Sequence, residues 1–413
     1  MPKYDVAIVG AGIAGLCTAA LLASAGKKVV LADPSDRAGG AVVPLEKDGI
    51  RLSSGPDSTY GLEPGGPLQR LHASLGFKRD ETGMPARYQV ALPDRRITVA
   101  PRNEETLDEL RREFPREIDT LGRLYRDSGQ LALRSSASRL SSFVAERRSA
   151  ASFLQRYRLS PELSSFFDVR SRYYFRRPVS ELSLHTLAFM LHTPPEHLQG
   201  GFGQLASRLF EFSRDRGADV HLNEPWPELL FHGRKLTGVR TAMGVIEARV
   251  YIMNASWPGD AFTMLFGIRD DVLPERMENT VLCLHDYQDV RTWNSLSVSP
   301  GSSERRTADG MRTLTASFCT PGSSDIARES LLDRIQSTIP FFRDFIVAAD
   351  DRLPGSRSIF QKENLLMKTH EEHADMPPMP FPSAVKNLIL LPDSSCGLVQ
   401  TVRAAQAVVS KLT

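Results

Sequence analysis

The distribution of apolar and polar positions at the start of the chain predicts a strand, a helix and a second strand. Residues 4–9 form a mostly apolar run that ends at Gly10, which is typical of a buried parallel strand. Residues 13–25 are rich in Ala and Leu at helical spacing, and Gly26 is suited to end this helix in a left-handed conformation. A short apolar run over 29–31 restarts a strand, so this segment predicts a β-α-β unit.

The glycines of this unit predict a nucleotide-binding turn. Gly10 permits the tight turn, Gly12 lets a diphosphate approach the backbone, and Gly15 lets the helix pack closely on the strand. The free amides at the helix start then face the phosphates. Asp33 follows the second strand, where a carboxylate accepts both ribose hydroxyls of an adenosine and disfavours the 2′-phosphate of NADP. The predicted cofactor-binding residues here are Gly10, Ala11, Gly12, Ile13, Ala14, Gly15 and Asp33.

The stretch that follows Asp33, PSDRAGG, points to the kind of dinucleotide. Together with the glycine turn it resembles the FAD-binding start of the superfamily of phytoene desaturases, monoamine oxidases and protoporphyrinogen oxidases. The resemblance implies that Arg37, Gly39 and Gly40 run along the FAD diphosphate towards the flavin. It also implies that Gly55, in the segment GIRLSSGP, lies beside the flavin. The expected cofactor is therefore FAD.

A later segment carries the same resemblance, closest to the phytoene desaturase branch. The glycine-rich residues 200–203 precede a predicted helix, and Gly217 is placed to cap its C-terminus. Gly233 and Gly238 predict the hairpin turns of a β-meander. Residues 248–256 are then expected to return the chain to the parallel sheet.

Four further cofactor contacts are implied by the resemblance alone. Trp226 stands where a family valine contacts the adenine through its backbone. After an apolar strand at 388–391, Asp393 matches an aspartate that binds the ribityl chain, although a proline replaces the preceding family glycine. Gly397 and Val399 lie where the last helix begins, with its positive dipole end directed at the flavin.

These patterns predict an α/β protein with two domains. The first is a Rossmann-like FAD-binding domain of the glutathione reductase type, with a parallel sheet and a β-meander. It is discontinuous and covers residues 1–75, 200–265 and 383–413. The second is a mixed α+β substrate-binding domain that covers residues 76–199 and 266–382.

Composition narrows the class of protein. The chain has 51 Lys and Arg against 49 Asp and Glu, and a net charge of +2 argues against nucleic-acid binding driven by charge. Four scattered cysteines without metal-type spacing favour a reduced, cytoplasmic protein. We expect neither a signal peptide nor a membrane-spanning helix. The oligomeric state is left open.

The segment from Arg134 to Arg177 is strongly basic, with ten arginines, three acidic residues and interleaved aromatic residues. One interpretation is a surface for peripheral contact with anionic lipids. The other is a set of solvated helix faces over an aromatic core.

No catalytic side chain is predicted, because oxidation of a C–H bond by a flavin needs no protein nucleophile. Lys362 and Lys368 occupy the region of the monoamine oxidase lysine, but the sequence around them does not match. The HEEH segment at 370–373 lacks the zinc-peptidase spacing and a third ligand, so no metal is expected.

The leading functional hypothesis is an FAD-dependent oxidoreductase that transfers a hydride to flavin N5. The hydride would come from a C–H or C–N bond of an apolar substrate of the carotenoid or isoprenoid kind. The first alternative is an amine or porphyrinogen oxidase. The second belongs to another class: a non-catalytic flavin-binding or partner-regulating protein.

Overall fold

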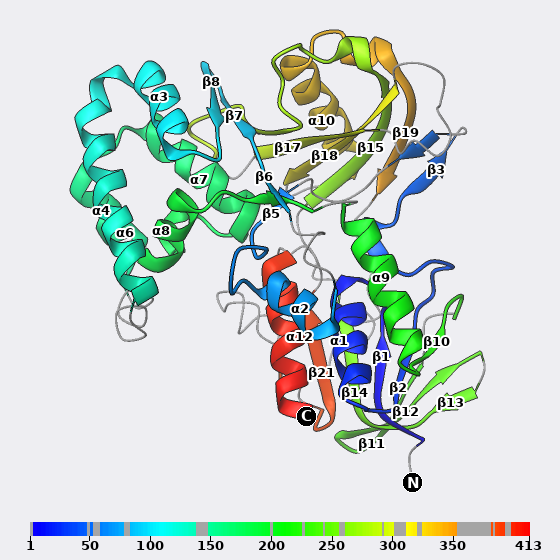
Figure 1. The fold of residues 1–413 in the computed structure, drawn as a ribbon. Helices are drawn as coiled ribbons and strands as arrows, with labels where there is room; N and C mark the ends of the chain where they lie inside the picture. The colour runs from blue at the N-terminus through cyan, green and yellow to red at the C-terminus, as the bar shows by residue number, and fades with distance from the viewer. Residues whose placement is uncertain are drawn as a thin grey trace.

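The structure is a computed structural model with two lobes, drawn one above the other in Figure 1. The lower lobe is built on a parallel sheet and contains both marked chain ends, whereas the upper lobe combines a mixed sheet with a group of helices. The structure describes residues 3–47, 50–52, 58–77, 83–137, 148–198, 201–224, 228–242, 244–255, 261–290, 293–300, 311–319, 324–352, 381–382, 385–392 and 398–413.

Six strands form the sheet of the lower lobe, in the order β10-β2-β1-β14-β21-β20. All neighbouring strands are parallel except β20 and β21. The predicted strands at 4–9, 29–31, 248–256 and 388–391 are all present to within one residue at either end. The bounds are β1 Tyr4–Val9, β2 Val29–Ala32, β10 Asp219–His221, β14 Ala248–Ala255, β20 Phe381–Pro382 and β21 Leu388–Pro392.

Helices cover one face of this sheet, and a small antiparallel sheet covers the other. Val6 and Ile8 of β1 lie in a core that they share with four helices, α1, α2, α9 and α12, whereas Ala7 and Val9 lie in a second core with the small sheet. This alternation is the period of two of a strand that is buried on both faces. The helices are α1 Ile13–Ser24, α2 Pro67–Leu75, α9 Gly201–Asp215 and α12 Leu398–Leu412. The small sheet contains β11 Glu228–His232, β12 Lys235–Thr241 and β13 Gly244–Ile246.

Three of the four predicted glycine turns are confirmed, and one is wrong. Gly26, Gly217 and Gly233 have positive φ angles of 75°, 84° and 60° and follow α1, α9 and β11. Gly238 lies inside β12 instead of in a turn. It pairs with Leu230 at a β-bulge, and a Cβ atom there would lie 2.6 Å from the Val245 side chain. Close approach of a neighbouring strand therefore accounts for this glycine.

The upper lobe contains a seven-stranded mixed sheet in the order β19-β15-β18-β17-β16-β7-β8. Only the pairing of β16 with β7 is parallel among the described neighbours. One face packs against α10 Ser324–Thr338. The strands are β7 Tyr88–Leu92, β8 Arg95–Val99, β15 Ala261–Arg269, β16 Thr280–Leu284, β17 Trp293–Pro300, β18 Met311–Cys319 and β19 Ile346–Arg352.

A group of helices lies beside this sheet and contains much of the basic segment. Phe153, Phe166, Phe167 and Tyr174 of that segment are buried in one core, so these four aromatic positions are core positions. Contact of its arginines with a membrane stays a prediction. The helices are α3 Asn103–Glu113, α4 Ile118–Ala137, α6 Ala150–Leu154, α7 Pro161–Phe175 and α8 Leu184–His192. The short strands are β3 Leu45–Lys47, β4 Ile50–Leu52, β5 Ser58–Thr59, β6 Met84–Pro85 and β9 Glu196–His197.

The predicted α/β class is confirmed. The six-stranded sheet takes its strands from residues 4–32, 219–255 and 381–392, and the seven-stranded sheet from 88–99 and 261–352. The domain boundaries themselves stay a prediction. Within the described part of the chain, every helix is too short or too polar to cross a membrane.

Three histidines predict a loss of stability in mild acid. Burial lowers the pKa of His72, His192 and His285 below the ordinary value of 6.5. The unfolded chain therefore takes up protons at a higher pH than the folded chain, and protonation favours unfolding. We expect the free energy of unfolding, measured by urea titration, to fall from pH 7.5 to pH 5.5. The variant His192→Gln should fall less steeply, and equal stability at both pH values would contradict this assignment.

Candidate cofactor and substrate site

The turn between β1 and α1 forms the base of the candidate cofactor site. Gly10 has a φ angle of 105°, a conformation that residues with side chains rarely adopt. A Cβ atom at Gly15 would lie only 1.9 Å from the Gly10 carbonyl oxygen, so only glycine lets α1 pack this closely. Ala11, Ile13 and Ala14 are buried around the turn. The backbone amides at the start of α1 are thus brought to the carboxyl edge of the sheet.

Asp33 lies at the end of β2 and holds this turn. Its two carboxylate oxygens accept hydrogen bonds from the amides of Ala11, at 2.5 Å, and Ser35, at 2.8 Å. Asp33 is 9% exposed, so this carboxylate is largely buried in the turn. Its contact with a ribose stays a prediction.

The segment after β2 folds back onto the glycine turn. The Gly39 amide donates to the Ala11 carbonyl oxygen at 2.7 Å, and Gly39 forms an isolated parallel bridge with Gly12. Gly39 and Gly40 have φ angles of 128° and 58°, which favour glycine. Arg37, between Asp33 and this contact, is exposed. The structure therefore brings the two predicted glycine clusters together, as their predicted role requires.

Asn254 completes this site and was not predicted from the sequence. It lies near the end of β14, next to β1, and a Cβ atom at Gly12 would lie 2.6 Å from its Nδ2 atom. Its Oδ1 atom is buried and has no hydrogen-bond partner in the described part of the chain. A sequence signal exists, because ligands of open α/β sheets bind outside the carboxyl ends of strands such as 248–255.

The helix α12 follows β21, so its first turn lies towards the carboxyl edge of the same sheet. Val399 is buried in its first turn and packs near Gly61, where a Cβ atom would lie 3.3 Å from the Val399 side chain. α12 also packs along α1, which places the first and last helices side by side (Figure 1). Four predicted site residues lie outside the described part of the chain: Gly55, Trp226, Asp393 and Gly397. The lysines and histidines between residues 362 and 373 also lie outside it.

Arg170 of the basic segment is buried beside the aromatic core that contains Val399. At this one position the arginine neither faces a membrane nor lies on a solvated helix face, so neither interpretation of the segment holds for it. Arg170 is 3% exposed, and its Nε and Nη2 atoms donate to Tyr88 Oη at 2.7 Å and to the Met190 carbonyl oxygen at 3.1 Å. Tyr60 Oη donates to the same carbonyl oxygen at 3.4 Å. Burial raises the pKa of Tyr60 and of Tyr88, so both phenols stay protonated at neutral pH.

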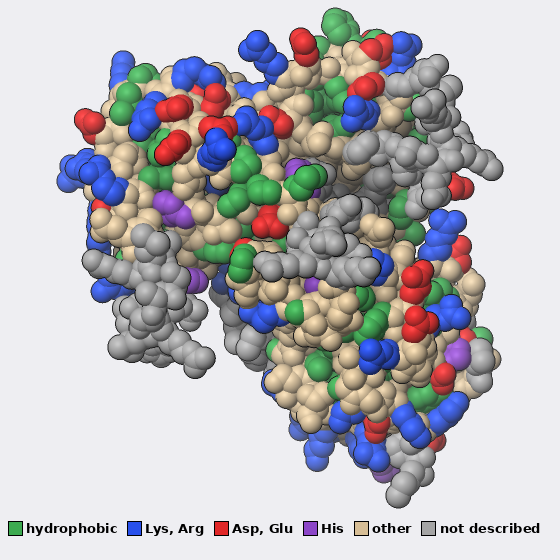
Figure 2. Space-filling model, in the orientation of Figure 1, with side chains coloured by type: hydrophobic (Ala, Val, Ile, Leu, Met, Phe, Trp, Pro, Cys, Tyr) green, Lys and Arg blue, Asp and Glu red, His purple; other side chains and the backbone are tan. Residues whose placement is uncertain are grey.

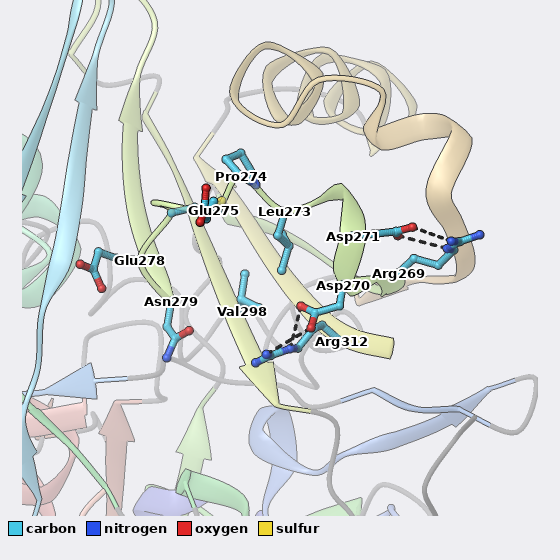
Figure 3. Close-up of a pocket in the computed structure, with 11 residues that line it drawn as sticks. Arg269, Asp270, Asp271, Leu273, Pro274, Glu275, Glu278, Asn279, Val298 and Arg312 are labelled. Atoms are coloured by element: carbon cyan, nitrogen blue, oxygen red, sulfur yellow. Dashed lines mark hydrogen bonds and ion pairs between the residues drawn. The ribbon is translucent and has the colours of Figure 1, made fainter. Parts of the chain in front are cut away.

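A separate hollow of about 680 Å³ lies on the face of the seven-stranded sheet that packs against α10 (Figure 3). Val298 lines it and also contacts the core under α10, so the hollow is on the face that α10 covers. Four of the charged residues that line it form ion pairs, Arg269 with Asp271 and Arg312 with Asp270. This hollow is therefore distinct from the site around the glycine turn.

Charges are mixed on the molecular surface. On the face drawn in Figure 2, the coloured Lys and Arg side chains of the upper lobe lie among Asp and Glu side chains. This distribution agrees with the near balance of charges along the chain.

The residues at the glycine turn fit a dinucleotide. Side chains at Gly10 or Gly12 would enter the narrow space beside Asn254, and the unpartnered Asn254 Oδ1 atom leaves an acceptor there. Amides, a carboxylate and a carboxamide therefore converge at the point where β2 and β14 lie on opposite sides of β1. That is the topological switch point, at which open α/β sheets bind nucleotides.

Comparison with known proteins identifies the family. Residues 13–277 match the model of the flavin containing amine oxidoreductase family, which covers more than half of the chain. The protein belongs to this family.

Among curated proteins, the chain is similar in sequence to a carotenoid isomerase and to a carotenoid desaturase. The chain is 24% identical to the chloroplastic prolycopene isomerase of Daucus carota over 309 residues, which cover 67% of this chain and 49% of the relative. It is 26% identical to a 4,4'-diapophytoene desaturase of Methylomonas sp over 300 residues, which cover 66% of this chain and 58% of the relative. The chain thus spans about half the length of these relatives.

A solved structure shares the fold. The crystal structure of an oxidoreductase from Methanosarcina mazei superposes with a TM-score of 0.66 at 13% sequence identity. The match covers 98% of this chain and all of that one.

Proposed function

We propose that this protein binds FAD and takes a hydride from a C–H bond of an apolar, isoprenoid-like substrate. The observation that carries the proposal is the convergence of Gly12, Gly39, Asp33 and Asn254 at the carboxyl edge of the parallel sheet. The choice of FAD rests on the family and on the second glycine cluster. The substrate class is supported by the carotenoid-modifying relatives.

Each part of the site has a separate role in this proposal. The amides at the start of α1 bind the diphosphate, and Asp33 accepts the ribose hydroxyls. When bound, the flavin supplies the hydride acceptor. The N-terminus of α12 places positive dipole charge near the ring. The aromatic residues around Tyr60 and Tyr174 exclude water from the adjoining space.

Three finer expectations belong to the same proposal. The lower lobe would be an FAD-binding domain of the glutathione reductase type, and the upper lobe would bind substrate. Asp393 and Gly397 would complete the flavin site, and Trp226 the adenine site. Contact of the basic segment with a membrane surface would give access to a lipid-soluble substrate.

Oxidation of a C–N bond remains the second candidate function, since the family description is that of amine oxidoreductases.

The visible spectrum of the purified protein tests this proposal. We expect flavin absorption bands, release of FAD on heating, and anaerobic bleaching of the bands by isoprenoids within one or a few turnovers. Aliphatic amines are the matched comparison, and bleaching by amines alone would transfer the proposal to the C–N class. Protein that stays colourless after incubation with excess FAD would refute it.

A further inference from the structure

One nitrogen of the buried Arg170 guanidinium is without a hydrogen-bond partner. Its Nε and Nη2 atoms donate to Tyr88 Oη and to the Met190 carbonyl oxygen. The Nη1 atom is buried and has no acceptor in the described part of the chain. Because Arg170 is 3% exposed, bulk water does not supply that acceptor.

The positive charge of Arg170 also lacks a counter-charge among the described residues. The guanidinium lies over the Phe166 ring, 5.2 Å from its centroid, and its polar neighbours there are tyrosines. By contrast, Arg172 of the same helix α7 pairs with Asp168 at 2.6 Å. Arginine stays protonated in proteins, so burial does not remove the charge of Arg170 as it can remove that of a lysine.

The tyrosines around Arg170 do not balance this charge. Burial raises the pKa of Tyr60, Tyr88 and Tyr125, so their phenols are neutral at neutral pH. A neutral phenol can accept a hydrogen bond from the guanidinium, but only an anion compensates a buried cation fully.

Arg170 lines a cavity of about 10 Å³. The cavity walls come from the end of β8 and from α3, α4, α7 and α8, which lie together in the upper lobe (Figure 1). None of the described residues that line it is acidic. A hollow of this volume is about the minimum for one water-sized particle, so it excludes sulfate and phosphate.

The helix α3 begins at the same cavity. Asn103 and Thr106, in its first turn, both line the cavity, and the preceding Arg102 supplies no side-chain cap. The acidic residues of this turn, Glu104 and Glu105, do not line it. A helix N-terminus carries about half a positive charge and free amides, both of which favour an anion.

We propose that this cavity is a binding site for one small monovalent anion, such as chloride, with Arg170 Nη1 as its main ligand. The start of α3 adds positive potential, and Tyr125, which also lines the cavity, can add an O–H donor. A water molecule would fill the same space but would leave the charge of Arg170 unbalanced. The site ties β8 to four helices and is independent of the proposed flavin chemistry.

Bromide, which scatters X-rays anomalously, is the first probe of this site. The full-length protein is dialysed exhaustively into sodium bromide without chloride and crystallised in the same salt. We expect an anomalous difference peak in contact with Arg170 Nη1. A cavity that contains only water, with no anomalous peak, overturns the inference.

The second measurement is urea unfolding in mixtures of sodium chloride and sodium gluconate at constant ionic strength, since gluconate is too large for the cavity. An anion that binds only the folded chain raises the ratio of folded to unfolded protein about tenfold at ten times its dissociation constant. We therefore expect that ratio to rise with chloride and then to level off. A ratio that does not respond to chloride contradicts the proposal.

Arg170→Met should remove the chloride response, because it keeps the length of the side chain and removes the cation. Arg172→Met is the matched control, since Arg172 lies on the same helix, is paired with Asp168 and does not line the cavity. It should keep the chloride response. A response that persists in Arg170→Met overturns the inference, and if that variant does not fold, the bromide experiment decides.

Discussion

The variant Gly12→Val is expected to fold and to lose its flavin. The nearest atom to a new Cβ is Nδ2 of Asn254, which is the end of a side chain that can rotate away. The fold therefore tolerates the change. The branched side chain, however, fills the space in which a diphosphate must approach the amides at the start of α1. We expect the flavin content of the purified variant to fall at least about tenfold, since even about 1.4 kcal/mol corresponds to a factor of ten in affinity.

Gly122→Val is the matched control for this prediction. Gly122 lies in α4, and no heavy atom lies within 4 Å of a Cβ atom built there. Absorbance of bound flavin per protein and the far-ultraviolet circular dichroism spectrum are measured for both variants. Gly12→Val that retains the flavin of the unmodified protein would show that the diphosphate does not lie at this turn.

The variant Gly15→Ala is expected to destabilise the fold itself, and not only to weaken flavin binding. A Cβ atom at Gly15 would lie 1.9 Å from the Gly10 carbonyl oxygen and 3.1 Å from its carbon, which are backbone atoms of the turn itself. α1 would have to move away from β1, although it is buried along almost its whole length. Overpacking in a core costs about 1–3 kcal/mol, occasionally more, and we expect at least about 3 kcal/mol here.

Urea unfolding of the flavin-free protein measures this effect without interference from the cofactor. Gly122→Ala is the control, since alanine inside a helix is about 1 kcal/mol more favourable than glycine. It should leave stability unchanged or raise it. Gly15→Ala with the stability of the unmodified protein would mean that α1 is not packed against β1 as described.

The sequence predicts well the parts of the fold in which the signal is local. β1, the glycine turn, α1 and β2 follow one another, so apolar runs and glycine positions are sufficient to place them. The contact between Gly12 and Gly39 agrees with the family resemblance, which implies that both motifs lie along the same diphosphate.

Long-range pairing could not be predicted in the same way. Asn254 reaches the site only because β14 pairs with β1, and Gly238 is needed because the Val245 side chain of the neighbouring strand β13 lies close to it. Arg170 reads as one charge in a basic segment, and its burial against Tyr88 depends on how α7 meets β7. Thr263, Ser295 and Ser317 lie side by side only because of the register of three strands, and a slip of one residue would place their side chains on the other face.

The pairing of β21 with β14, and of α12 with α1, has a consequence for synthesis on the ribosome. β1 and α1 emerge first, but their partners at residues 388–412 are translated several hundred residues later. At about 5–20 residues per second, the nascent lower lobe waits many seconds with one edge of its sheet unpaired. We therefore expect the nascent lower lobe to be exposed to chaperones during that interval, and its nucleotide-binding fold to be completed only after translation ends.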